Sequence, residues 1–334
     1  MARVHNFNPG PAALPLPVLE QIRDEMLDYK GTGMSVLESS HRGKDILAMH
    51  EETKALLREL GGFGPEFHIM FLGGGASTQF YMVPMNLLKP GESADYINTG
   101  TWATAAIKEA KIVAKCNVAG STESEEFTRL PRQDELKLDP NAVYLHFTSN
   151  NTIRGTQWKK WPDAGKVPLV CDMSSDFFWR PFDPKPFGLI YGGAQKNLGP
   201  AGVTYVFIRQ DMLDRCRTDL PTMVKYKVHV EKDSMHNTPP VFPIYVVNLV
   251  LKWVKAEGGL QVIEKRNLEK ARLVYDCVDS SGGYYRGTVK DPGSRSTMNL
   301  TIRMQSEDLE EKFFAAAGKA GLKGLKGHRS VGGI

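Results

Sequence analysis

Phe187-Gly-Leu-Ile-Tyr-Gly-Gly-Ala-Gln-Lys-Asn-Leu-Gly-Pro-Ala-Gly202 runs from a strand-like apolar stretch into a glycine-rich turn that carries one lysine, Lys196. Val203-Thr-Tyr-Val-Phe-Ile208 follows with the pattern of a second strand. A lysine beside glycine is most often a solvated turn residue, because lysines are rarely buried. Here two strands would fix the turn and partly remove Lys196 from water. That burial lowers the pKa of the amine and makes its neutral form available for Schiff-base chemistry.

A carboxylate upstream gives this lysine a partner. Val167-Pro-Leu-Val-Cys-Asp172 has the pattern of a short buried strand, and Asp172 stands 24 residues before Lys196. That separation leaves room for one connection and one more strand, so we expect both side chains at the same edge of a sheet. Pyridoxal phosphate (PLP) needs such a pair, because a lysine binds the cofactor and an acid keeps its pyridine nitrogen protonated. The two segments therefore predict a PLP site.

A third segment is typical of an anion site. Gly73-Gly-Gly-Ala-Ser-Thr78 separates a strand pattern at Phe67–Leu72 from a helix pattern at Gln79–Leu88. A strand, a glycine-rich turn and a helix aim free backbone N–H groups at an anion, although an ordinary tight turn is the alternative. A dinucleotide-binding fingerprint would need a glycine in place of Thr78, and the chain contains no Walker A sequence.

The order of elements predicts an α/β fold. Strand and helix patterns alternate from about residue 65 to residue 210, which favours a mostly parallel sheet with its site at the strand C-termini. Beyond Arg209 the pattern changes to that of a smaller α+β domain. We expect an N-terminal arm at 1–15, a large domain at 16–257 and a small domain at 258–334. Further elements are predicted at Leu16–Tyr29, Lys44–Leu60, Phe242–Ala256, 258–279, Tyr284–Val289, Thr297–Met304 and Glu307–Ala317.

Composition excludes several classes of protein. The 334 residues exceed what one compact core usually holds, and a net charge of +4 is too small and dispersed to indicate nucleic-acid binding. The four cysteines are scattered without metal-ligand spacing, which favours reduced thiols in a cytoplasmic protein and no metal site. The N-terminus has no apolar signal region, and no segment is typical of a membrane span.

Six segments together resemble the phosphoserine aminotransferase family, which belongs to the class V aminotransferases and to the fold-type-I PLP enzymes. The resemblance runs in order from Phe7 to the last residue. It implies a large domain with a mostly parallel sheet of the seven-stranded type, and a smaller C-terminal domain. The matching segments are Ser40-His-Arg-Gly43, Gly73-Gly-Gly-Ala-Ser-Thr-Gln-Phe80, Cys171-Asp-Met-Ser-Ser175, Gly193-Ala-Gln-Lys-Asn197, Asn237-Thr-Pro-Pro240 and Lys326-Gly-His-Arg-Ser-Val-Gly-Gly333.

The resemblance implies a role for each matched residue. Lys196 would bind PLP covalently and later carry the proton between substrate and cofactor. Asp172 would pair with the pyridine nitrogen, Trp102 would stack on the ring, and Thr152 would contact it. The residues implied to hold the cofactor phosphate are Ala76, Ser77 and Gln195, with Asn237 and Thr238 reaching the phosphate of a neighbouring subunit in a homodimer.

A second set of matched residues is implied to bind the substrate's anionic groups: His41, Arg42, His328 and Arg329. Arginine suits this role because its planar fork binds phosphate or carboxylate through two hydrogen bonds. Two His-Arg pairs in unrelated surface turns are the alternative. The implied reaction transfers the amino group of glutamate to 3-phosphohydroxypyruvate, giving O-phosphoserine for serine biosynthesis. A phosphorylated substrate of pyridoxine biosynthesis also fits.

Some positions depart from the family. Members continue beyond Ile334 with an Arg-Ala-Ser motif whose arginine binds the substrate carboxylate, so the resemblance implies that the printed chain binds PLP but turns over poorly. Asn151 stands where a glutamate is common, and Arg154 adds a charge beside Thr152.

Other functions stay open at this point. Another class V aminotransferase with a different keto acid, and a non-catalytic protein of the same fold, both fit the motifs. A cysteine desulfurase fits poorly, because Cys277 falls in a predicted helix and Cys171 in a predicted strand. A nucleotide-binding dehydrogenase lacks its fingerprint.

Overall fold

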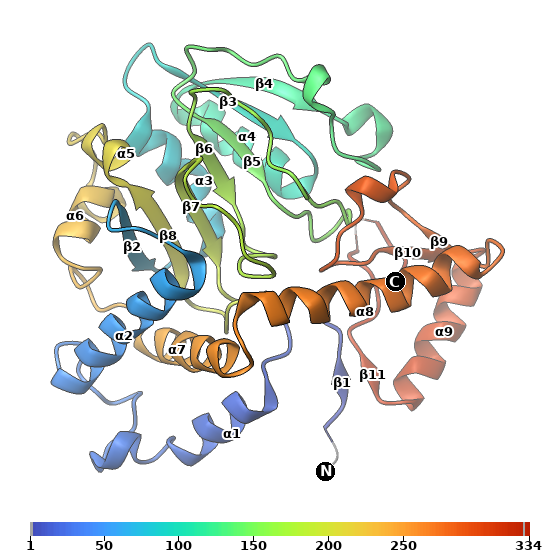
Figure 1. The fold of residues 1–334 in the computed structure, drawn as a ribbon, viewed down its shortest axis with the longest axis horizontal. Coiled ribbons are helices and arrows are strands. Elements are labelled where there is room, and N and C mark those ends of the chain that lie inside the picture. The colour runs from blue at the N-terminus through green and yellow to red at the C-terminus, as the bar shows by residue number, and fades with distance from the viewer. Residues whose placement is uncertain (1–2, 330) are drawn as a thin grey trace.

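The structure is a computed structural model that describes residues 3–329 and 331–334 (Figure 1). Its strands are β1 (His5–Asn6), β2 (Phe67–Leu72), β3 (Ser93–Asn98), β4 (Lys115–Ser121), β5 (Leu145–Thr148), β6 (Leu169–Asp172), β7 (Phe187–Gly193), β8 (Thr204–Arg209), β9 (Tyr285–Gly287), β10 (Ile302–Met304) and β11 (Leu322–Lys323). Its α-helices are α1 (Leu16–Asp24), α2 (Lys44–Gly61), α3 (Gly75–Leu87), α4 (Thr101–Val113), α5 (Gln210–Asp214), α6 (Tyr226–Glu231), α7 (Val241–Ala256), α8 (Leu260–Ser280) and α9 (Glu307–Lys319).

A seven-stranded sheet forms the centre of the fold, in the order β2-β8-β7-β6-β5-β3-β4. β8 pairs antiparallel with both β2 and β7, and the remaining neighbours are parallel. The predicted α/β fold with a mostly parallel sheet is therefore confirmed. Because β6 and β7 are adjacent and parallel, their C-terminal ends, and with them Asp172 and the Lys196 turn, lie at one edge.

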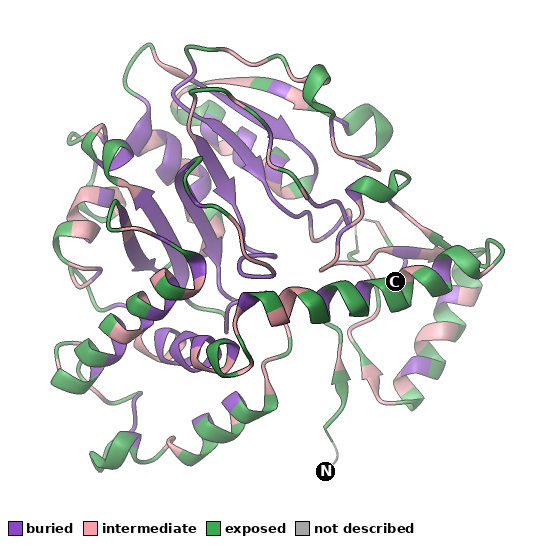
Figure 2. Cartoon of the chain, in the orientation of Figure 1, coloured by how far each residue is buried: buried purple, intermediate pink, exposed green. Residues whose placement is uncertain are grey.

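Side chains of the sheet alternate between two hydrophobic cores. Ile69 and Phe71 of β2 belong to the core that includes α2 and α7, whereas Met70 and Leu72 belong to the core with α3 and α4. This period of two is what a strand requires when both of its faces are covered. Apart from the edge strand β4, the strands of the sheet are accordingly buried along most of their length, while α8 exposes much of its surface (Figure 2).

The C-terminal quarter, from α8 onward, extends away from the sheet. α8 leads from the sheet towards β9, β10 and α9 (Figure 1). β9 and β10 form an antiparallel pair. The N-terminal arm contributes to this region, because β1 pairs parallel with β11.

Several predicted boundaries were wrong. The first helix ends at Asp24 rather than Tyr29, and Asp28 is already extended, with φ of −143°, before the turn that holds Lys30. The helix predicted to begin at Gln79 begins at Gly75, which brings the end of the glycine turn into its first turn. The strand predicted from Thr297 begins only at Ile302, since Thr297 donates its backbone N–H to the Gln157 side chain instead of to a ladder. β4 was not predicted.

No helix in the described part of the chain is both long enough and apolar enough to span a bilayer.

The packing of α2 gives a direct test of the core. Leu57 is 0% exposed and Leu47, on the same helix, is 41% exposed. We expect Leu57→Ala to lower the free energy of unfolding by about 2–5 kcal/mol because it leaves a cavity. Leu47→Ala should change it by no more than about 0.5 kcal/mol. Urea denaturation followed by circular dichroism measures both, and equal losses would contradict this placement of α2.

Candidate active site

Lys196 lies in the turn between β7 and β8. Its Nζ donates a hydrogen bond to Thr152 Oγ1 at 2.6 Å. The N-terminal arm covers the side chain, because a Cβ added at Gly10 would lie 2.8 Å from Lys196 Cγ, and Ala12 N donates to Gln195 O at 2.8 Å. Burial lowers the pKa of Lys196, although the nearby carboxylates oppose the shift. The amine is thus held in place and shifted towards its neutral form, in the direction that the sequence predicted.

Asp172 ends β6 and is 4% exposed. Its Oδ1 accepts hydrogen bonds from Ser174 N at 2.9 Å and from Ser174 Oγ at 2.6 Å. Ser174 Oγ in turn accepts a bond from Gly193 N at 3.1 Å, which links the carboxylate to the end of β7. Burial raises the pKa of Asp172, while the bonds from Ser174 and the charge of Lys196 favour the ionised form.

Most of the residues predicted to bind the cofactor line one cavity. Ala76, Ser77, Trp102, Asp172, Gln195 and Lys196 all line it. The sequence analysis gave six further lining residues no individual role. Gly75 belongs to the glycine turn predicted to bind an anion, and Phe80, Ser174 and Ser175 stand in segments that carry the family resemblance. These six are Gly75, Phe80, Thr148, Asn150, Ser174 and Ser175.

The residues of this cavity fit PLP. Asp172 supplies a buried acid, and Lys196 supplies an amine that lies 5.3 Å from the centre of the Trp102 indole ring. α3 begins at the cavity without a side-chain cap and without an acidic residue in its first turn, so its N–H groups are available to a phosphate. The Oγ1 of Thr148 is buried without a hydrogen-bond partner, as expected where a polar ligand completes the site.

Asn237 and Thr238 lie apart from this cavity. They line a second one, together with residues of β2, α3 and the 223–240 segment. The residues lining this second cavity are Phe71, Leu72, Gly73, Thr78, Tyr81, Met82, Met223, Val224, His229, Asn237, Thr238, Pro239 and Pro240.

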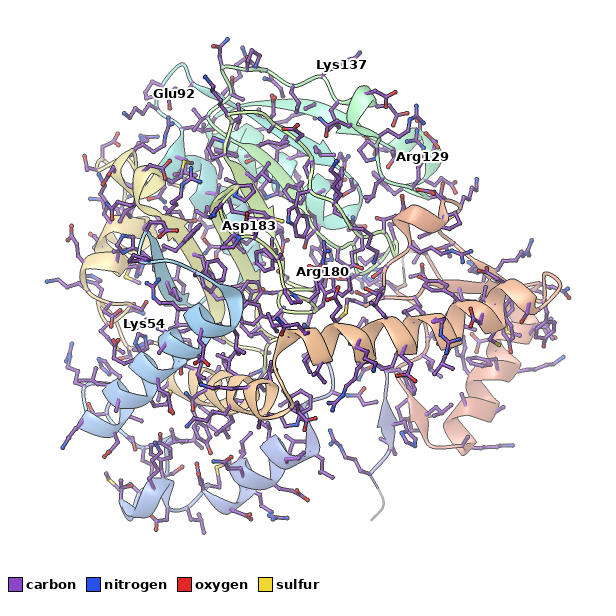
Figure 3. The ribbon with its side chains drawn as sticks, viewed as in Figure 1. Lys54, Glu92, Arg129, Lys137, Arg180 and Asp183 are labelled. Atoms are coloured by element: carbon purple, nitrogen blue, oxygen red, sulfur yellow. The ribbon has the colours of Figure 1, made fainter. Side chains whose placement is uncertain are left out.

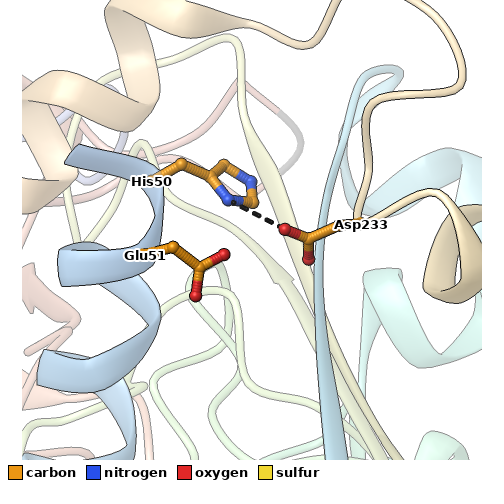
Figure 4. Close-up of side chains that lie close together, drawn as sticks. All are labelled: His50, Glu51 and Asp233. Atoms are coloured by element: carbon orange, nitrogen blue, oxygen red, sulfur yellow. Dashed lines mark ion pairs between the residues drawn. The ribbon is translucent and has the colours of Figure 1, made fainter. Parts of the chain in front are cut away.

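An ion-pair network anchors the turn that precedes Asn237. His50, Glu51 and Asp233 meet there, with His50 Nδ1 3.6 Å from Asp233 Oδ2 (Figure 4). Lys54 on α2, labelled in Figure 3, pairs with Glu51 at 2.6 Å and with Asp233 at 2.7 Å. Because this ammonium already supplies the positive charge that a metal would bring, the cluster ties α2 to the turn as a salt-bridge network.

The four residues implied to bind substrate anions do not join the cavity. His41 and Arg42 precede α2, and the Nε2 of His41 is buried without a hydrogen-bond partner. His328 and Arg329 are exposed in the C-terminal segment. All four belong to the described residues, and none of them lines the cavity of Lys196.

A second buried carboxylate, Asp176, was missed by the sequence analysis. It is 3% exposed and accepts a hydrogen bond from Gln157 Nε2 at 3.0 Å and another from Ser149 Oγ. Ser149 Oγ also lies 3.1 Å from the carbonyl oxygen of Asp172. Burial raises the pKa of Asp176 to about 6. These contacts connect residues far apart in sequence, so no local motif indicates them.

The fold and this cavity define a PLP-dependent transferase of the aminotransferase class. The family model described as aminotransferase class-V matches residues 4–332, and the chain belongs to this family. Phosphoserine aminotransferase from Desulfatibacillum aliphaticivorans is 56% identical over 333 residues, which are 99% of this chain and 91% of that protein.

Solved structures agree with this assignment. Phosphoserine aminotransferase from Bacillus circulans subsp. alkalophilus is 53% identical, has a TM-score of 0.97, and is matched over 99% of this chain and 92% of that one. The PLP-bound phosphoserine aminotransferase from Trichomonas vaginalis is 37% identical, with a TM-score of 0.94 and coverage of 99% and 94%.

The raised pKa of Asp176 predicts a pH-dependent contribution to stability. The folded-state pKa of about 6 lies above the ordinary aspartate value. Stability from this group is therefore fully present below about pH 4 and is lost as the pH rises through about 6. We expect Asp176→Asn to remove this loss, so that the variant gains about 3 kcal/mol relative to the parent between pH 4 and pH 7.

Urea denaturation at each pH measures this difference in unfolding free energy. Asp183→Asn is the control, because Asp183 is an exposed carboxylate (Figure 3). Parallel pH profiles for Asp176→Asn and the parent would contradict the assigned shift.

Proposed function

We infer that the chain catalyses PLP-dependent transfer of the amino group of glutamate to 3-phosphohydroxypyruvate, giving O-phosphoserine and 2-oxoglutarate for serine biosynthesis. The observation that carries this inference is the buried pair of Lys196 and Asp172 in one cavity beside the start of α3. Relatives named phosphoserine aminotransferase support the substrates, since they are 48–56% identical over nearly the whole chain.

Each residue of the cavity has a chemical task in this proposal. PLP, when bound, supplies the electron sink that stabilises negative charge at the substrate carbon. Lys196 binds the cofactor and then, as a neutral amine, removes and returns the proton at that carbon. Asp172 would pair with the pyridine nitrogen, and its bonds from Ser174 favour the ionised form that this role needs.

The remaining cofactor residues orient the group. Ala76, Ser77 and Gln195 bind the phosphate near the first turn of α3, where the N–H groups and the helix dipole favour an anion. Trp102, which lines the same cavity, would stack on the ring. Thr152 contacts the cofactor and positions the lysine through its 2.6 Å bond.

The proposal includes a homodimer with shared sites. Asn237 and Thr238 line a cavity of about 390 Å³ away from Lys196 of the same chain, which supports their use by a neighbouring subunit. His41, Arg42, His328 and Arg329 would bind the phosphate and carboxylate groups of the substrates in the assembled enzyme. Four free cysteines support a reducing, cytoplasmic location.

Replacement of Lys196 tests the covalent role. Borohydride reduction of the PLP-loaded protein should attach the cofactor to the peptide that contains Lys196, as detected by mass spectrometry. Lys196→Ala should lose this label and about 10²–10⁴-fold of the transamination rate, because the proton-transfer group is gone. Asp172→Asn should keep the label and lose roughly 10²-fold, since an electrostatic partner of the ring is removed.

Lys159 provides the matched control, because burial also lowers the pKa of this lysine, to about 8, although it lies outside the cavity. Lys159→Met should therefore keep the label on Lys196. A label on Lys159 in the parent protein would overturn the assignment.

Mixing two inactive variants tests the shared site. Lys196→Ala lacks the lysine, and a double variant, Asn237→Ala with Thr238→Ala, lacks the groups proposed to reach the neighbour's phosphate. A mixed dimer contains one site with both defects and one site with neither. We expect activity to return to roughly a quarter of the parent value after statistical exchange of subunits. No recovery, with exchange verified by native mass spectrometry, would reject sites shared in this way.

A further inference from the structure

Arg154 lies in the loop that presents Thr152 to the lysine. Thr152, two residues before Arg154, accepts a hydrogen bond from Lys196 Nζ at its Oγ1. Gly155 N donates to Asn151 O at 2.8 Å and closes the loop into a turn. Thr301 Oγ1 then donates to Arg154 O at 3.3 Å, which holds the turn from the C-terminal side. The backbone of Arg154 is therefore fixed two residues from the threonine that contacts Lys196, although Arg154 itself is not among the residues that line the cavity.

The Arg154 side chain lies beside the start of α4. A Cβ added at Gly100, the residue before the helix, would lie 3.5 Å from Arg154 Cγ. Trp102 of the same helix lines the Lys196 cavity. The arginine stem thus lies between two segments that both contribute to the site, at the C-terminal edge of the sheet.

The guanidinium of Arg154 has no anionic partner among the described residues. Three described arginines have a buried Nε without a hydrogen-bond partner: Arg154, Arg180 and Arg295. Arg180 uses Nη2 to donate to Lys159 O at 2.6 Å, and Arg295 pairs with Asp279 at 2.6 Å.

For Arg154, the described residues offer the guanidinium neither a hydrogen-bond acceptor nor a carboxylate within bonding distance, and its carbon lies 5.6 Å from the centre of the Phe127 ring. A ring face replaces only part of the hydration that a partly buried guanidinium loses. The N–H groups of the Arg154 guanidinium therefore remain available to hydrogen-bond an acceptor on a ligand.

We propose that Arg154 binds an anionic group of the substrate, a carboxylate or phosphate, and so determines specificity for acidic amino acids and keto acids. The inference rests on the proposed function, because glutamate and 3-phosphohydroxypyruvate each carry two anionic groups. A planar guanidinium donates two parallel hydrogen bonds to either group. The partly buried position strengthens such a bond, since it is screened less than one at the surface.

Equilibrium binding of unreactive acids tests the proposal. Glutarate has the two carboxylates of the glutamate skeleton, and butyrate has one. Calorimetry on the PLP-loaded protein should show that Arg154→Met weakens glutarate binding about tenfold, whereas Arg154→Lys, which keeps the charge, weakens it less. Arg154→Met keeps an apolar stem against Gly100 and Phe127. If it does not fold, as judged by thermal unfolding, Arg154→Gln takes its place.

A surface control removes the effect of net charge. Arg272→Met also deletes one positive charge, from an exposed pair with Asp276 on α8, and should leave glutarate affinity within twofold. In steady-state assays, Arg154→Met should raise KM for 3-phosphohydroxypyruvate about tenfold while kcat stays within twofold, because the contact is made in both ground and transition states.

The pattern of losses identifies the group that is bound. If Arg154→Met lowers the affinities for glutarate and butyrate equally, Arg154 binds the carboxylate that both acids share. If it lowers the affinity for glutarate alone, Arg154 binds the distal carboxylate. Affinities for both acids within twofold of the parent would overturn the proposal. Failure of the proposed function looks different: the parent itself would not convert glutamate and 3-phosphohydroxypyruvate, while Arg154→Met would still bind glutarate weakly.

Discussion

The removal of one amine and one carboxylate from water at a single sheet edge is the constraint on which this site depends. Burial pushes the pKa of Lys196 down and that of Asp172 up, so each group is driven towards its neutral form. For the amine this shift is useful, because a nucleophile must be unprotonated. For the carboxylate it is a cost, and the two bonds from Ser174 offset it by favouring the ionised state.

The sheet meets this constraint through its topology. Parallel β6 and β7 place Asp172 and the Lys196 turn side by side, and antiparallel β8 closes that turn by returning along β7. On the same edge, α3 follows β2 without a side-chain cap, which leaves its first N–H groups for an anion. One edge therefore carries an amine, an acid and a helix start with uncapped N–H groups, although these come from three separate stretches of sequence.

Sequence predicted the parts of this arrangement that are local. The glycine turn, the strand that ends in Asp172 and the lysine turn each carry their own signal, and six of the predicted cofactor residues line one cavity. The contacts that complete the cavity were not predictable in the same way. Asp176 reaches Gln157 across 19 positions, and Asn150 reaches Asn299 across 149. The edge strand β4 mixes polar and apolar residues, so only its pairing with β3 defines it.

The arginines considered for substrate binding differ in how far each is buried before any ligand arrives. Arg42 and Arg329 are exposed, and an exposed guanidinium stays hydrated at little cost until a ligand or another subunit covers it. Such residues suit a site that forms only on assembly, because no subunit has to bury an unpaired charge beforehand. Arg154 differs, since its Nε is already buried and its backbone is already fixed beside Thr152. A cation placed in this way has lost hydration before the substrate arrives, so an incoming carboxylate or phosphate meets donors that need little further desolvation or ordering.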